Sequence, residues 1–410
     1  LATGYHQLGI LAELRGDYAE AERRYQQSLT IFEGLGNQAG LASSYHQLGM
    51  LAQARGDYAE AERRYQQSLT ISEQLGNQAG LASGYHQLGI LAQLRGDYAE
   101  AERRYQQSLT IEEQLGNQAG LASSYHQLGI LAQERGDYAE AERRYQQSLT
   151  IEEQLGNQAG LARGYHQLGI LAQARGDYAE AERRYQQSLT IEEQLGNQAG
   201  LADSHHQLGI LAQDRGDYAE AERRYQQALT IKEQLGDQAG LASSYHQLGM
   251  LAQARGDYAE AERRYQQALT ISERLGDQSG LASGYQQLGR LAQLRGDYAE
   301  AERRYQQSLT INEQLGNQAG LAITLSQLGI MRANTGNHTD AVTLHIRALS
   351  IQQTIGTPQA ANNITRLAEL RNHLGPDTFT KTASQTLDHQ SINTLTALLD
   401  TQVATDQSPT

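Results

Sequence analysis

The sequence of 410 residues contains no cysteine, no tryptophan and only three prolines. Without cysteine there can be no disulfide framework and no thiolate chemistry, which fits a reducing cytoplasm. No apolar run approaches the ~20 residues that a transmembrane helix needs. The formal net charge of −14 lacks the basic excess that binding to nucleic acid or to anionic lipid requires. These absences favour a cytoplasmic protein that binds neither nucleic acid nor membranes.

Repetition is the dominant feature of the chain. The segment GLASSYHQLGMLAQARGDYAEAERRY at residues 40–65 returns, almost unchanged, every 40 residues. The first eight units are nearly identical, and the ninth, residues 321–360, has diverged. The nine units are marked by Gly16, Gly56, Gly96, Gly136, Gly176, Gly216, Gly256, Gly296 and Gly336. A repeat of this length indicates a stack of supersecondary units, so it overrides a domain count based on chain length.

Each unit is predicted to form two helices. In the second unit, Leu41 and Leu48 recur at helical spacing, and Gly56 ends this first helix. Asp57 and Glu60 form the sequence of a capping box that starts a second helix, which continues to about residue 75. A similar signal, Asn77 after Gly76, caps the first helix of the next unit. Because the connections are short, the two helices must be antiparallel, and the pairs must stack into a solenoid to bury their apolar faces.

The end of the chain differs from the repeats. Residues 361–375 resemble one further half-unit, and apolar residues beyond it predict one or two short helices that cover the last repeat. These apolar residues are Phe379, Leu387, Ile392, Leu395, Leu398 and Leu399. We therefore expect nine helix-pair repeats over residues 1–360, capping helices over 361–400 and a disordered tail at 401–410. The chain begins part-way through a unit and without Met, so we expect it to belong to a larger protein.

The constant letters of the unit resemble the tetratricopeptide repeat over about residues 1–360. They are Tyr45, Leu48, Gly49, Ala52, Gly56, Asp57, Tyr58, Ala61, Tyr65 and Ser68. The units differ from the usual repeat of about 34 residues in their length and in lacking a final proline. This long form is similar to the repeats of kinesin light chains and to the repeat arms of bacterial signalling ATPases of the STAND or NB-ARC-like type. The resemblance implies an all-α, right-handed superhelical solenoid that binds proteins and has no catalytic activity of its own.

Most letters that differ between the first helices share one side of the helix. Positions 43, 46, 50, 53 and 54, and their equivalents in the other units, fall within an arc of about 100°; we call this arc the variable stripe. The family resemblance implies that it lines the inner, concave wall, where related proteins contact their ligands. The candidate partner-binding residues are His46, Met50, Ala54, His86, Ile90, Leu94, His126, Ile130, Glu134, Arg163, His166, Ile170, Asp203, His206, Ile210, Asp214, His246, Met250 and Arg290.

Within this stripe, apolar and charged positions are expected to have different roles. The column of Ile90, Ile130, Ile170 and Ile210 would anchor a partner by apolar contact. The charges of Glu134, Arg163, Asp203, Asp214 and Arg290 would set its register, because an unmatched buried charge is costly. Arg163 and Asp203 occupy equivalent positions in successive units and could pair or bracket one ligand group. An alternative is that tight curvature buries part of the apolar column between neighbouring first helices.

A column of seven histidines, from His6 to His246, raises the question of metal binding. Equivalent residues of neighbouring units are about 8–10 Å apart, whereas zinc needs nitrogen ligands at about 2.0–2.1 Å. We therefore expect no metal and no cofactor, and a polar ladder bonded to glutamines of the Gln53 type; sensing of pH is an open alternative. Glu60 and Arg64 are expected to form a weak, solvated pair.

No catalytic motif is present. The junction LGNQAG lacks the preceding strand and the final G-K-[ST] of a phosphate loop, and no nucleophile lies beside a base. We therefore expect a protein that is not an enzyme. The leading hypothesis is an interaction scaffold or sensor arm, part of a larger signalling protein, that binds a peptide or helix of a partner in the concave groove. Two alternatives remain: a self-assembling repeat module, and the regulatory arm of an enzyme whose catalytic domain lies upstream.

Overall fold

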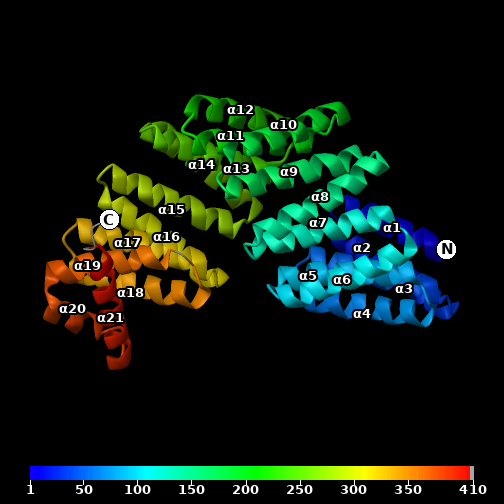
Figure 1. Cartoon of the computed structure of the whole chain (residues 1–410), viewed down its shortest axis with the longest axis horizontal. Coiled ribbons are helices and arrows are strands. Elements are labelled where there is room, and N and C mark those ends of the chain that lie inside the picture. Colours follow the sequence, from blue (N-terminus) through cyan, green and yellow to red (C-terminus); the bar gives the residue numbers. More distant parts are fainter. Residues whose placement is uncertain (358, 407–410) are drawn as a thin grey trace. The chain divides into compact units, whose positions relative to one another are not determined.

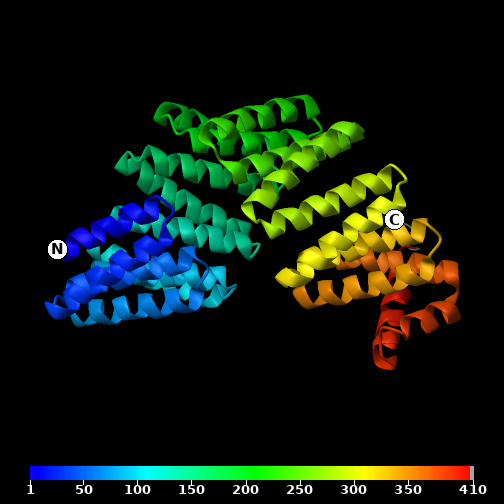
Figure 2. The ribbon, with the colours of Figure 1, turned by 180° about the vertical axis from the view of Figure 1, so that it is seen from behind.

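The computed structural model describes residues 1–357 and 359–406, and all regular elements of these residues are helices. They form repeated antiparallel pairs (Figures 1 and 2). The first helices are α1 (Ala2–Leu14), α3 (Gln38–Ala54), α5 (Gln78–Leu94), α7 (Gln118–Glu134), α9 (Gln158–Ala174), α11 (Gln198–Asp214), α13 (Gln238–Ala254), α15 (Gln278–Leu294), α17 (Gln318–Asn334) and α19 (Ala360–Leu374). The second helices are α2 (Tyr18–Gly34), α4 (Tyr58–Gln74), α6 (Tyr98–Leu115), α8 (Tyr138–Leu155), α10 (Tyr178–Leu195), α12 (Tyr218–Leu235), α14 (Tyr258–Leu275), α16 (Tyr298–Leu315) and α18 (His338–Ile355).

The chain divides into two compact parts, Leu1–Gly200 and Leu201–Thr410, with the boundary inside α11. Each part is an all-α solenoid of helix pairs, as the repeat predicts. None of the helices in the described ranges combines the length and the hydrophobicity of a bilayer span.

The helix ends follow the predicted turn chemistry, with one correction. The Asp57 carboxylate accepts a hydrogen bond from the Glu60 amide at 3.1 Å, and Asn77 accepts one from the Gly80 amide at 3.1 Å. The other half of the predicted capping box is not formed, because the Asp57 amide donates to the Ala52 carbonyl at 2.9 Å. The Glu60 carboxylate instead binds Arg63 and Arg64.

The core repeats with the sequence. In the first part of the chain, Tyr65 and Leu69 of α4 pack with Leu88 and Leu91 of α5, so one unit completes the core of the next. The two helices of a unit approach closely at Gly49, where an added Cβ would come within 2.6 Å of the Tyr65 ring. Equivalent contacts recur at the other first helices, so this glycine marks a close helix crossing.

The last helices close the ninth unit. α19 is the predicted half-unit, and α20 (Pro376–Ala383) and α21 (His389–Asp406) follow it. Phe379 and Leu399 are buried against Leu367 of α19, as expected for capping helices. Helix α21 reaches Asp406, inside the segment where a disordered tail is expected, and residues 407–410 lie outside the described residues.

Candidate functional site

The histidines of the variable stripe are packed on the tyrosines of their own second helices. The His46 and Tyr65 ring centres are 5.6 Å apart, and the rings of the other six histidines lie equally close to their tyrosines, at 5.6–5.7 Å. Burial lowers the pKa of His46, so this histidine is neutral near physiological pH. For His126 burial lowers the pKa to about 4, helped by the nearby charge of Arg163. The six histidines named as candidate partner-binding residues, His46, His86, His126, His166, His206 and His246, are all half-buried.

The sequence predicts that glutamines of the Gln53 type bond to the stripe histidines. In the structure, the side-chain oxygens of these glutamines accept hydrogen bonds from tyrosines. The Tyr65 hydroxyl donates to the Gln53 side-chain oxygen at 3.0 Å, and the equivalent bond recurs in the following units at 2.8–3.2 Å. The glutamine therefore satisfies the buried tyrosine hydroxyl, which would otherwise lose a hydrogen bond on burial. Across the described residues, no three side chains of His, Cys, Asp or Glu gather as a metal site would need.

The apolar column of the variable stripe is half-buried. Five of its residues pack against a core that their own unit shares with the following one: Met50, Ile90 and Ile130 in the first part of the chain, and Ile210 and Met250 in the second. Ile170 is also half-buried. The structure therefore fits the alternative in which part of the apolar column is buried better than a column that is fully open to a partner. A charge placed here would disturb packing between units as well as any partner contact.

Other residues of the stripe are exposed. In the first part of the chain these are Ala54, Leu94, Glu134 and Arg163; in the second they are Asp203, Asp214 and Arg290. The Leu94 side chain is 52% exposed although it is large and apolar. Arg163 and Asp203 belong to different parts of the chain, and their pairing stays a prediction.

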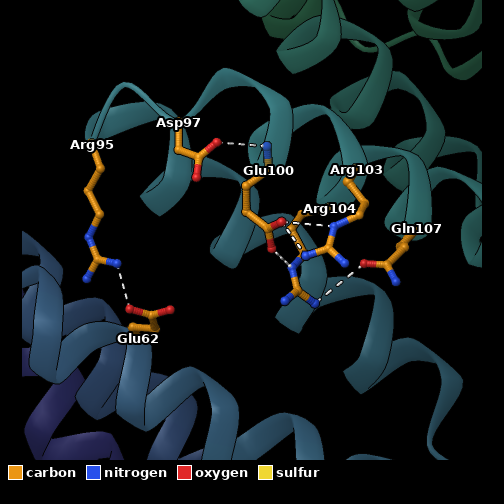
Figure 3. Close-up of polar contacts among 7 residues, drawn as sticks. All are labelled: Glu62, Arg95, Asp97, Glu100, Arg103, Arg104 and Gln107. Atoms are coloured by element: carbon orange, nitrogen blue, oxygen red, sulfur yellow. Dashed lines mark hydrogen bonds and ion pairs between the residues drawn. The ribbon is translucent and has the colours of Figure 1, made fainter.

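The acidic and basic residues of the second helix make more contacts within the fold than the sequence suggests (Figure 3). The Glu100 carboxylate binds both Arg103 and Arg104, as expected for a helix surface. The Arg104 guanidinium, however, also lies 5.6 Å from the centre of the Tyr85 ring of α5. Its side chain is only 21% exposed, against 61% for Arg103. Arg104 and its equivalents therefore hold the two helices of a unit together by cation–π contact.

Neighbouring units are also joined by an ion pair that the sequence analysis missed. Arg95 at the end of α5 lies 2.6 Å from Glu62 of α4 (Figure 3). The same pair, between residues 33 apart, recurs at Arg55–Glu22, Arg135–Glu102, Arg175–Glu142, Arg255–Glu222 and Arg295–Glu262. The spacing is too long for a single helix, so only the stacking of units brings the charges together.

A second variable position, on the second helix, was also missed. Its residues are Phe32, Ser72, Glu112, Glu152, Glu192, Lys232, Ser272, Asn312 and Gln352. Glu112 is only 8% exposed and lies on Gly120 at the start of α7, where a Cβ would meet its carboxyl carbon at 2.3 Å. The positive end of a helix dipole favours a carboxylate there. Comparing the second helices letter by letter would have revealed this position.

Two cavities are lined by both helices of a pair. One of about 760 Å³ is lined by α13 and α14, and one of about 720 Å³ by the equivalent residues of α1 and α2. Their linings include Tyr245, Arg263 and Gln266 in one case and Tyr5, Arg23 and Gln26 in the other. Most lining residues belong to the constant scaffold, and Arg274 of the first cavity differs from the glutamine found there in most units, so the cavities offer little variation with which to select a partner.

Comparison with known proteins agrees with this architecture. The family model described as "Tetratricopeptide repeat" matches residues 1–74, 80–154, 160–234 and 240–314. No sequence among curated proteins matches the chain.

Solved structures share the fold at low sequence identity. The apo quorum sensor NprR from B. thuringiensis has a TM-score of 0.61 at 13% identity, covering 76% of this chain and 87% of its own. A Signal Transduction ATPase with Numerous Domains with a tetratricopeptide repeat sensor, from Pyrococcus horikoshii, has a TM-score of 0.56 at 14% identity, covering 83% and 54%. An IFIT1 monomeric mutant with m7Gppp-AAAA has a TM-score of 0.56 at 14% identity, covering 98% and 90%.

These likenesses show the fold, and the matched model covers more than half of the residues. The chain belongs to the tetratricopeptide repeat family.

Proposed function

We propose that this protein-interaction repeat module binds a peptide or helix of a partner protein along the variable stripe of its first helices. One observation carries the proposal: within an almost invariant unit, the first helices differ at exposed positions such as those of Leu94, Glu134 and Arg163. Differences at buried positions would alter packing, whereas differences at exposed ones alter what the surface recognises. The constant residues maintain the scaffold, whereas most residues that differ between the first helices lie on the variable stripe.

The partner chemistry follows from the exposed residues of the stripe. Leu94 offers apolar surface, and Glu134 and Arg163 add charges of opposite sign in the following units. A partner segment with an apolar anchor followed by a basic and then an acidic residue would complement them. The proposed role is binding, in a larger signalling protein of the cytoplasm.

The proposal is tested with a phage-displayed library of random peptides selected on the whole chain. Enriched peptides are labelled, and their affinity is measured by fluorescence anisotropy. We expect Leu94→Glu and Arg163→Glu to weaken binding at least tenfold while leaving the melting temperature unchanged, because both side chains are exposed. Arg103→Ala is the control, since Arg103 lies exposed on the second helix. Equal loss with the control, or no loss with the stripe variants, would move the site elsewhere.

A further inference from the structure

The ninth unit replaces three packed side chains with smaller ones at a single place. In earlier units a stripe histidine packs on the tyrosine of the second helix, and the tyrosine hydroxyl donates to a glutamine; Gln286 replaces the histidine in the eighth unit. In the ninth unit the histidine becomes Ser326, the glutamine becomes Ala333 and the tyrosine becomes His345. The ninth unit therefore lacks three groups at this place: an imidazole, a carboxamide and the outer part of a phenol.

Two cavities occupy this place. One of about 480 Å³ has Ser326 in its wall, and one of about 270 Å³ has Ala333. Both share Ile330 of α17, His345 of α18, and Arg366 and Glu369 of α19. The larger volume lies in the range typical of small-molecule sites.

A buried hydrogen-bond network prevents collapse of the walls. Asn363 of α19 donates to the Gln352 side-chain oxygen at 2.7 Å and to the Ser326 hydroxyl at 2.9 Å. The Asn363 oxygen lies 2.6 Å from Nδ1 of His345. His345, Gln352 and Asn363 are 1%, 3% and 2% exposed. These bonds fix His345 and Ser326 toward α19, so the space that the missing groups leave stays open.

We propose that this pocket, formed by α17, α18 and α19, binds a phenol group, either that of a tyrosine side chain in a peptide or that of a small free phenol. In earlier units this space is filled by the stripe imidazole, which packs on the tyrosine ring, and by the hydroxyl end of that tyrosine, whereas the His345 ring occupies the inner part of the tyrosine position. A phenol ring would take the place of the missing imidazole beside His345, with its hydroxyl in place of the missing one. A hydrogen-bond acceptor is also available. In the first unit the Tyr25 hydroxyl donates to the Glu13 carboxylate at 2.7 Å, and Glu369, whose exposed carboxylate also accepts from Arg366 at 2.9 Å, brings a carboxylate to both cavities.

The pocket is independent of the proposed stripe binding. Its wall comes from the diverged unit and the half-unit that follows it, whereas Leu94, Glu134 and Arg163 lie in the first part of the chain. Loss of one site would leave the other intact, so the two proposals can fail separately.

The test uses the whole chain and three probes: p-cresol, toluene and N-acetyl-tyrosinamide. Binding is followed by saturation-transfer NMR and by titration calorimetry. We expect p-cresol to bind more tightly than toluene, because only p-cresol brings a hydroxyl. Binding of N-acetyl-tyrosinamide would assign the site to a peptide tyrosine, and binding of p-cresol alone would assign it to a small phenol. Absence of binding by both phenols would overturn the proposal.

The decisive variant restores the residues of the other units: Ser326→His, Ala333→Gln and His345→Tyr together. We expect it to lose phenol binding at least tenfold and to melt at a higher temperature, because the chain's own side chains fill the space. If the triple variant misfolds, Ala333→Gln replaces it in the test. This variant adds a single amide to the wall and should also weaken binding. The matched control is Arg143→Ala, an exposed change far along the sequence. Undiminished binding by both filled variants would overturn the proposal.

Discussion

The ring of Tyr145 lies directly against the Cα of Gly129: a Cβ on that glycine would come within 2.6 Å of the ring Cδ1. Tyr145 is fully buried, and its hydroxyl is fixed by a hydrogen bond to Gln133 at 2.9 Å. The ring therefore cannot move aside without breaking this bond. The fold depends on glycine here for close approach of two helices, since Gly129 lies inside α7.

Gly129→Leu should lower the free energy of unfolding by ~1–3 kcal/mol, because the added side chain overpacks the crossing. Urea unfolding followed by circular dichroism measures the effect. Gly4→Ala is the control, since nothing lies within 4 Å of its added Cβ. Equal stability of the Gly129→Leu protein and its parent would contradict the crossing.

Arg144→Ala should destabilise the protein by ~0.5–1 kcal/mol more than Arg143→Ala. Both arginines bind Glu140, but only Arg144 also lies over the Tyr125 ring, at 5.7 Å. Thermal unfolding of the two variants in parallel isolates the ring contact. Equal melting temperatures would mean that the cation–π contact contributes nothing.

Asp137→Ala should cost about 1 kcal/mol, because the amide of Glu140 would lose its cap at the start of α8. Asp137→Asn should cost much less, since Asn337 already caps α18 by accepting from the Asp340 amide at 3.2 Å. Chemical denaturation distinguishes the two. A similar loss in both variants would point to the charge of Asp137 and not to its hydrogen bond.

Stability should fall as the pH falls from about 6.5 toward about 4, because of the buried histidines. Burial lowers the pKa of His126 and of His206 to about 4, with smaller contributions from Arg163 and Lys232 respectively. In the unfolded chain these histidines take up protons near pH 6.5. The unfolded state therefore binds more protons between the two values, and acid favours it.

The measurement is the melting temperature between about pH 7 and about pH 5.5, where carboxylates still contribute little. His126→Gln and His206→Gln should flatten the dependence, and glutamine is compatible with the position because Gln286 occupies it in the eighth unit. An unchanged slope in the double variant would show that these histidines do not carry the effect.

The repeat made most of the fold predictable. Period, capping residues and glycines at helix ends are local signals, and they predicted nine helix pairs and one further first helix, which the described residues confirm. The Glu60 side chain was assigned to a capping box because the spacing fits, yet Arg63 and Arg64 attract its carboxylate more strongly. Local spacing does not determine which of several nearby donors forms a hydrogen bond with a carboxylate.

The sequence by itself determined the helix pairs, their stacking and the positions at which the units vary, because these depend on residues close together in the chain. Only the tertiary structure decided which of those positions are open. It half-buried Met50 and its equivalents by packing them on a core shared with the following unit, and left Leu94 exposed. It also paired Arg95 with Glu62 and opened the space beside His345. These outcomes depend on the distance between helices of different units, and that distance is set by packing that no single unit encodes.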